Sequence, residues 1–265
     1  MASLRRAPAI AAALAPLLAG LALSLELVPR PTEPAYVAAP AVIPADTVVG
    51  WVVDANDWLD RGFLGVRHKR SAVTSADLGE PLVIVTDSGS IVYPVSMKSP
   101  SGPMMDNIRL IPFAEQRVIV TGRLATRDRE RGVAVDRIAR AAGAGQTRTF
   151  PAREIPNSKV IGRVTALSCW LGQADTGAAH AKCARAHADA GEPLILVSDS
   201  GYMYYPVVRD TMTDTPDFTK LFRYVEQKVV VSGTVINRGK ARGVVINSVA
   251  AYTPDRSYDT LRPER

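Results

Sequence analysis

Apolar residues recur in short runs that are typical of β-strands, and the runs occur in the same order twice. In the first half of the chain they lie at 48–53, 82–86, 90–95, 117–124 and 132–138. In the second half they lie at 160–167, 194–198, 202–208, 228–237 and 243–250. Alternation of apolar and polar residues over a few positions predicts half-buried strands. Each half is therefore expected to contain five strands.

The two halves are also related residue by residue. The segment Gly79-Glu80-Pro81-Leu82 returns 112 positions later as Gly191-Glu192-Pro193-Leu194. After a shift to a spacing of 111, Gly122 is matched by Gly233. A repeat of this kind predicts two domains and allows one copy to be compared with the other. Positions common to both copies are expected to serve the fold, and a local function should be sought where they differ.

Turn and helix signals fall between the predicted strands. Asp87-Ser88-Gly89 and its match Asp199-Ser200-Gly201 predict a hairpin between strands two and three of each copy. Glu80 and Glu192 are assigned to the turns that lead into strand two. Both copies carry a long insertion between strands one and two, and residues 68–77 of the first are expected to form a short helix. Further short helices, near 107–114 and 217–226, are expected before strand four.

This order of elements resembles the OB-fold, a five-stranded Greek-key barrel with a helix between strands three and four. The segments Val118-Ile119-Val120-Thr121-Gly122 and Val229-Val230-Val231-Ser232-Gly233 are similar to that fold, because a glycine within a strand lets it curl around a small barrel. The chain thus resembles tandem OB-fold proteins exported by bacteria. The resemblance implies a mainly β protein with two tandem OB-fold-like five-stranded barrels, each with a helical insertion between strands 1 and 2. It implies no activity, since this fold hosts many functions.

The N-terminal region has the pattern of a membrane anchor. Residues 7–25 carry no charge and follow Arg5 and Arg6. Their length is close to that of a membrane-spanning helix, and the preceding positive charges predict that the chain after them lies outside the cytoplasm. Five prolines between residues 29 and 44 predict a semi-rigid spacer. We expect one N-terminal transmembrane helix and a location in the periplasm or otherwise outside the cytoplasm, with a cleaved signal peptide as the alternative.

These patterns together predict six segments. They are an anchor or signal at 1–28, a Pro-rich spacer at 29–45, a first OB-like domain at 46–143, a linker at 144–157, a second OB-like domain at 158–253 and a polar C-terminal tail at 254–265.

Charge and motifs narrow the classes of function. The net charge of +6 is spread over both copies, whereas nucleic-acid-binding proteins usually gather positive charge into a patch, so nucleic acid is not the expected partner. The sequence contains no Gly-rich phosphate loop, nucleophile elbow or His-Glu-x-x-His motif. We therefore expect no catalytic residues and a protein that is not an enzyme.

The insertion of the second copy is the place where chemistry is expected. Its candidate residues are Cys169, His180, Cys183 and His187. If residues 178–188 are helical, the last three lie on one face. Two thiolates and two imidazoles could bind zinc or copper. The alternative, which we expect, is a Cys169–Cys183 disulfide without a cofactor, since an exported protein is oxidised and a disulfide removes the thiolate ligands.

The first copy provides a comparison for this insertion. Its matching residues are Asp57, His68, Ser71 and Ser75. Only the histidine is retained, so a metal site shared by both copies is not expected, and a hydrogen bond at the helix start is the expected shared role of His68 and His180. A hydrogen bond from Asp57 or Ser71 is expected to hold the first insertion in place. Trp58 and Trp170 are expected to pack each insertion against its barrel.

These observations favour a non-enzymatic, membrane-anchored interaction protein outside the cytoplasm. Its expected partners are the membrane and the other subunits of a membrane complex, for example one of respiratory or photosynthetic electron transfer, in which it is an accessory subunit. One alternative is a metal-binding or thiol-redox protein that uses the Cys/His insertion. The other is binding of oligosaccharide or nucleic acid on a barrel face, where the candidates for stacking are Tyr202, Tyr204 and Tyr205.

Overall fold

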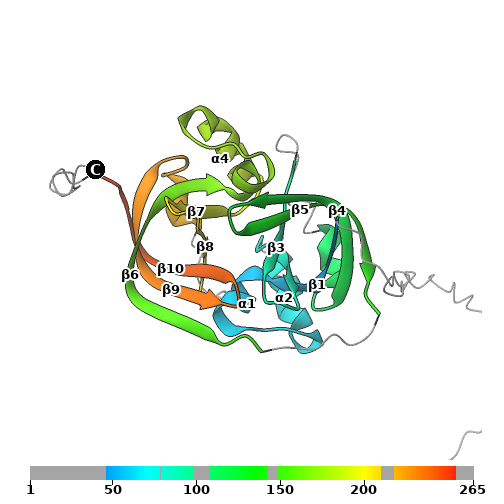
Figure 1. Ribbon diagram of the computed structural model, residues 1–265. Helices are drawn as coiled ribbons and strands as arrows, with labels where there is room; N and C mark the ends of the chain where they lie inside the picture. The colour runs from blue at the N-terminus through cyan, green and yellow to red at the C-terminus, as the bar shows by residue number, and fades with distance from the viewer. Residues whose placement is uncertain (1–45, 78, 98–107, 143–148, 210–217, 255–265) are drawn as a thin grey trace, which may run out of the picture. The chain divides into compact units, whose positions relative to one another are not determined.

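In the computed structural model, each half of the repeat forms a closed five-stranded barrel (Figure 1). The structure describes residues 46–77, 79–97, 108–142, 149–209 and 218–254. The first barrel consists of β1 (Thr47–Asp54), β2 (Leu82–Thr86), β3 (Ile91–Pro94), β4 (Arg117–Arg127) and β5 (Glu130–Arg140). The second consists of β6 (Ala152–Ala166), β7 (Leu194–Ser198), β8 (Met203–Pro206), β9 (Lys228–Arg238) and β10 (Ala241–Ala251).

The strand order is the same in both barrels and is consistent with tandem OB-like folds. The orders are β1-β2-β3-β5-β4 and β6-β7-β8-β10-β9, with the first and last strands paired in each. Both sheets are mixed, because β3 runs parallel to β5 and β8 runs parallel to β10. The predicted mainly β architecture with two barrels is therefore confirmed. No family assignment follows from the topology alone.

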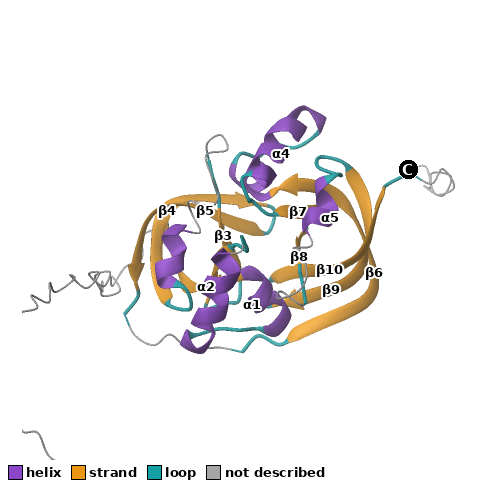
Figure 2. Cartoon of the chain, turned by 180° about the vertical axis from the view of Figure 1, so that it is seen from behind, coloured by secondary structure: helices purple, strands orange, loops and turns teal. Residues whose placement is uncertain are grey.

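Short helices follow the first strand of each barrel, as predicted (Figure 2). In the first barrel they are α1 (Ala55–Arg61), η1 (Val66–His68) and α2 (Lys69–Asp77), and η2 (Ile111–Phe113) precedes β4. In the second they are η3 (Ser168–Gly172), η4 (Ala178–His180) and α4 (Ala181–Asp189), and α5 (Phe218–Phe222) precedes β9. The sequence did not reveal α1 or η3. Strand β6 begins at Ala152, within the predicted linker, because it pairs with β9 from Arg238 onward.

The predicted glycine positions are confirmed by close approaches of the backbone. A Cβ atom on Gly122 would overlap the main-chain oxygen of Ala134, and one on Gly233 would overlap that of Val245. The β4–β5 register shifts between Thr121 and Gly122. These two glycines therefore let β4 and β9 bend sharply.

Two of the predicted segments fall outside the described residues. They are the anchor or signal at 1–28 and the spacer at 29–45; most of the polar tail, from residue 255 onward, also lies outside.

Within the described part of the chain, none of the helices has the length and apolar character needed to cross a membrane.

The two barrels share one hydrophobic core. Both barrels lie in a single compact unit, and one cluster of buried side chains draws residues from both. Many of its members are matched pairs of the repeat: Trp58 and Trp170, Leu59 and Leu171, Tyr93 and Tyr205, and Val95 and Val207. The repeated motifs around these residues therefore join the two copies to each other. The sequence alone predicts only that these motifs serve the fold within each copy.

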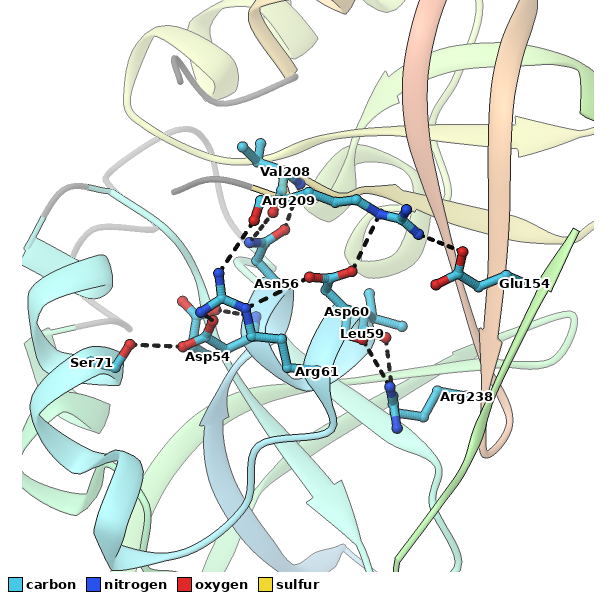
Figure 3. Close-up of polar contacts among 11 residues, drawn as sticks. Asp54, Asn56, Leu59, Asp60, Arg61, Ser71, Glu154, Val208, Arg209 and Arg238 are labelled. Atoms are coloured by element: carbon cyan, nitrogen blue, oxygen red, sulfur yellow. Dashed lines mark hydrogen bonds and ion pairs between the residues drawn. The ribbon is translucent and has the colours of Figure 1, made fainter. Parts of the chain in front are cut away.

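Polar contacts across this core are also matched. The side-chain amide of Asn56 donates to the main-chain oxygen of Val208 and accepts from its N–H, both at 2.7 Å (Figure 3). In the reverse direction, the hydroxyl of Ser168 accepts from the N–H of Ser96 at 2.8 Å. Asn56 corresponds to Ser168, and Ser96 corresponds to Val208. Matched positions of the two barrels thus form hydrogen bonds in both directions, as in a pair of copies related by an approximate two-fold axis.

Arg238 contributes three further hydrogen bonds beside this core. Its guanidinium donates to the main-chain oxygens of Leu59 at 3.0 Å, Asp60 at 2.9 Å and Phe150 at 2.5 Å. Figure 3 shows it beneath the end of α1, next to the Leu59 carbonyl. Its matched residue, Arg127, donates to the main-chain oxygen of Trp170 at 2.7 Å. Each barrel thus uses an arginine at the end of its fourth strand to bind the first helix of the other.

Replacing Arg238 should weaken the packing of the two barrels against each other. We expect Arg238→Ala to lower the free energy of unfolding by about 3 kcal/mol, because three main-chain oxygens lose a charged donor. Denaturant unfolding of the full chain measures this. The matched change Arg127→Ala removes one such bond and should have a smaller effect; equal effects of the two variants would contradict this assignment.

Candidate functional site in the second insertion

The helical insertion of the second barrel brings three metal-binding side chains together. Cys169 comes from η3, and Cys183 and His187 lie one turn apart on α4. One ligand atom from each residue lies within 4.8 Å of the other two. Cys169 and His187 are buried, and Cys183 is partly exposed. The cluster is thus a compact set of soft ligands with one side near solvent.

The two cysteines are free thiols in this structure, with their sulfur atoms 4.0 Å apart. A disulfide requires a separation of about 2.05 Å. Two thiolates bound at tetrahedral angles to one zinc ion, with Zn–S bonds of about 2.3 Å, lie about 3.8 Å apart. The observed separation is close to the second value, and the predicted disulfide is not supported by it.

A buried carboxylate orients the imidazole of His187. Glu192 Oε2 lies 2.7 Å from His187 Nδ1, and Glu192 Oε1 accepts from the N–H of Ser168. Because a carboxylate accepts hydrogen bonds, Nδ1 is the nitrogen that donates to Glu192, and Nε2 is the nitrogen left to bind a metal ion. The side-chain amide of Gln173 lies 3.4 Å from Nε2. A carboxylate that fixes the tautomer of a histidine in this way is the usual second contact of a metal-binding imidazole.

The electrostatic environment of the sulfur atoms favours a cation. Burial raises the pKa of the Cys169 thiol well above its usual value, and the nearby Cys183 and Glu192 raise this pKa further. These surroundings destabilise an isolated thiolate. A bound metal ion would offset this effect, because its positive charge stabilises the deprotonated form of its thiol ligands. The site is therefore better suited to a thiophilic cation than to a reactive free thiolate.

His180 is not part of this cluster, and its predicted place on the same helical face is wrong. The chain forms a 3-10 turn over Ala178–His180 before α4 begins at Ala181. His180 is not among the residues whose ligand atoms converge. Its imidazole instead lies 3.8 Å from the carboxylate of Asp175.

The first barrel holds its insertion by a hydrogen bond at the equivalent place. The hydroxyl of Ser71 donates to the carboxylate of Asp57 at 2.9 Å. These residues correspond to Cys183 and Cys169, so the predicted hydrogen bond is confirmed. Of the other matched residues, Ser75 is buried and His68 stacks on Phe63 with ring centroids 4.0 Å apart. The two copies thus close the insertion at the same point, with oxygen atoms in the first and sulfur atoms in the second.

Glu192 and Gln173 are the residues that the sequence analysis did not connect with the site. Glu192 was assigned to the turn before strand two. In the structure its side chain is 1% exposed, which is unusual for a carboxylate without a specific partner. A signal was present in the sequence, since Glu192 lies five residues after His187 on the far side of Gly191. Spacing across a turn nevertheless does not define where a side chain points.

The three tyrosines do not form a common binding face. Tyr205 is buried in the shared core, and its hydroxyl donates to Glu80 of the first barrel at 3.3 Å. Tyr204 packs against the core of the second barrel. The ring of Tyr202 contacts the guanidinium groups of Arg129 and Arg242, at 4.7 and 3.8 Å from its centroid. Two of the three therefore serve packing.

A matched pair of glutamates anchors the two insertions to their barrels. Glu115 accepts from the N–H of Gly65 at 2.5 Å, and Glu226 accepts from that of Gly177 at 2.6 Å. Both glutamates adopt a positive φ, of 59° and 60°. Glu226 also accepts from the hydroxyl of Thr165 at 2.5 Å. Burial raises the pKa of Glu115 from its usual 4.5 to about 8, against the lowering effect of the Gly65 N–H, and Asp57 raises it further.

This pKa predicts that Glu115 opposes folding at alkaline pH. The folded chain retains the proton between about pH 4.5 and 8, so its stability should fall as the pH rises through this range. Glu115→Gln keeps an acceptor for Gly65 but cannot ionise. We expect this variant to exceed the wild type in unfolding free energy by about 3 kcal/mol at pH 9 and to differ little at pH 4. Denaturant unfolding at both pH values tests this, and an equal difference at the two would contradict it.

Comparisons of the chain with models of known protein families, with curated proteins and with solved structures find no match. The interpretation of the site therefore depends on its own chemistry. That chemistry consists of two thiols 4.0 Å apart, an imidazole oriented by a carboxylate, and no further His, Cys, Asp or Glu ligand within reach among the described residues.

Proposed function

We propose that this chain is a non-enzymatic binding protein whose second barrel holds one thiophilic metal ion. The ligands are the sulfur atoms of Cys169 and Cys183 and Nε2 of His187. The observation that carries this proposal is the convergence of one ligand atom from each of the three residues within 4.8 Å. Nε2 is the proposed ligand of His187 because Glu192 bonds to Nδ1. Thiolate and imidazole ligands select zinc or copper among the common ions.

The number of ligands bears on the choice of ion. Three protein ligands suit copper(I), and they also suit a zinc ion whose fourth position is taken by water or another small ligand. Gln173 is not counted as a ligand, because the atom that lies 3.4 Å from Nε2 of His187 is its amide nitrogen, which donates hydrogen bonds and does not bind metal ions. Thiol redox chemistry would use the same two sulfur atoms, and it competes with metal binding because a disulfide cannot supply thiolates.

Metal titration of the reduced, metal-free full chain tests this proposal. We expect one zinc or copper(I) ion per chain by native mass spectrometry. Cys183→Ser should lower the affinity at least about 100-fold, because it removes a ligand. Glu192→Gln should lower it about 10- to 100-fold, because the imidazole loses its orienting carboxylate.

His180→Ala is the matched control, since His180 lies in the same insertion but outside the cluster. This variant should bind the metal as the wild type does. Failure of the reduced wild type to bind either ion would overturn the proposal. So would a native chain that is lighter by two hydrogens and resists alkylation until it is reduced, because this shows a disulfide in place of the site.

A second candidate function is that of a membrane-tethered accessory subunit outside the cytoplasm. The observation that favours it is the shared core, which makes the two barrels one body and fixes their outer surfaces relative to each other. A body of this kind, carried on the predicted apolar segment at 7–25 and a proline-rich spacer, suits attachment to a larger membrane complex. It does not depend on the metal site.

Co-purification from the native membrane tests this second function. The full chain should be extracted by mild detergent together with the same membrane subunits in repeated preparations. A triple change of Trp58, Leu59 and Arg238 to Ala, which disrupts the shared core, should reduce this association while the membrane fraction still contains the chain. Recovery of a lone monomer after the mildest extraction would contradict the proposal.

A further inference from the structure

A polar pocket of about 400 Å³ lies in the second barrel beside the β7–β8 hairpin. Its walls include two arginines, Arg127 from the first barrel and Arg163 from β6. They also include Thr165, Thr176 and the indole of Trp170. Its size is in the range of sites for small molecules. It is separate from the Cys/His cluster, whose ligand residues are not among those that line it.

The equivalent place in the first barrel is filled by the chain itself. The ring of Phe150 lies 6.4 Å from the ring of Trp58, measured between centroids, and is the nearest group to the open side of Gly89. Arg238 donates to the main-chain oxygen of Phe150. Trp58, Gly89 and Arg238 correspond to Trp170, Gly201 and Arg127, so the first copy shows what this arrangement holds: a planar ring with an acceptor oxygen beside it.

The second copy has the same arrangement without such a ring. The group nearest to the open side of Gly201 is the carboxylate of Asp128, and no aromatic ring of the described residues packs on Trp170. The guanidinium of Arg127 lies over the indole, 5.4 Å from the ring centroid. The walls have also changed. Three apolar residues of the first copy, Trp51, Val53 and Leu64, are replaced by Arg163, Thr165 and Thr176. The hydroxyl of Thr165 is used by Glu226, so Arg163 and Thr176 are the replacements that leave polar groups for a guest.

The two arginines are held in place while keeping further donors. Arg127 donates one N–H to the main-chain oxygen of Trp170, and Arg163 donates one to that of Glu226 at 2.8 Å. A guanidinium has five N–H donors, and the planar pair suits carboxylate or phosphate groups. Of the two carboxylates in the lining, Asp199 is paired with Lys228 at 2.5 Å. The other, Asp128, can accept a hydrogen bond from a hydroxyl group of a guest.

We propose that this pocket binds a small organic anion with a planar ring, which carries a carboxylate or phosphate group. The ring lies against Trp170, as Phe150 lies against Trp58. The anionic group accepts hydrogen bonds from Arg127 and Arg163. Because Arg127 and Asp128 belong to the first barrel and the other lining residues to the second, the ligand contacts both barrels and requires their packing.

Calorimetric titration of the full chain with phenyl phosphate and with benzoate tests the proposal. At least one of the two should bind with a Kd on the order of 1 mM or below, as expected for ligands of this size. Benzyl alcohol, which has the ring but no charge, should bind at least tenfold more weakly. Absence of binding by both anions, or equal binding of the neutral alcohol, would overturn the proposal.

Replacing pocket residues of the second copy by the matching residues of the first copy tests where the anion binds. Arg163→Trp introduces the residue of the first copy and should weaken binding at least tenfold. Arg123→Trp makes the same chemical change at an exposed position of β4 and should not affect it. Thr176→Leu provides a second variant at a position outside any strand and should also weaken binding. Unchanged binding in both pocket variants would show that the ligand lies elsewhere.

The C-terminal tail is the competing occupant. Residues 255–265 lie outside the described part of the chain, and in the register of the repeat Leu261 corresponds to Phe150. Removal of these residues should leave the affinity for the anion unchanged, because a leucine does not complement polar walls. Loss of the affinity for the anion after truncation would show that the tail, and not the described pocket alone, forms the binding site, and would overturn the proposal.

Discussion

Packing of the two barrels against each other is the constraint on which the rest of the structure depends. Matched residues of the repeat, such as Trp58 and Trp170, meet in one buried cluster rather than each filling its own barrel. Their burial removes a large apolar area from water, which is the main favourable term in such association. Asn56 and Arg238 then satisfy the main-chain groups at the edge of this core. Neither barrel could expose its half of the cluster to water without a cost.

This packing also explains why the copies could diverge. The residues of the shared core are matched between the copies, and the differences lie around them. At the closure of the insertion, the first copy has a hydrogen bond between Ser71 and Asp57 where the second has the thiols of Cys183 and Cys169. At the pocket beside Trp170, the second copy has polar walls where the first has apolar residues. The cysteine pair and the polar pocket both lie next to η3, where the second insertion leaves β6. Trp170 of η3 belongs to the shared core, which holds this part of the chain in place.

Much of the architecture could be predicted from the sequence. The alternating runs and the Asp-Ser-Gly turns predicted the strands, and Gly122 and Gly233 were predicted where barrel strands must bend. The Ser71–Asp57 hydrogen bond was anticipated from the comparison of the copies. The helix α1 was not, because Ala55–Arg61 is short and its buried face is defined by the other barrel. His180 was misplaced because a 3-10 turn and an α-helix place residues at the same spacing on different faces.

The sequence by itself determined the number of copies, the order of their strands and the residue types available for chemistry, because these depend on local periodicity and on turn residues. Only the tertiary structure decided which of those residues meet. Glu192 joins His187 because the turn at Gly191 folds it back, and Arg127 reaches Trp170 because one barrel packs on the other. Contacts between residues far apart in the chain depend on how surfaces fit together, and no spacing along a single sequence records that fit.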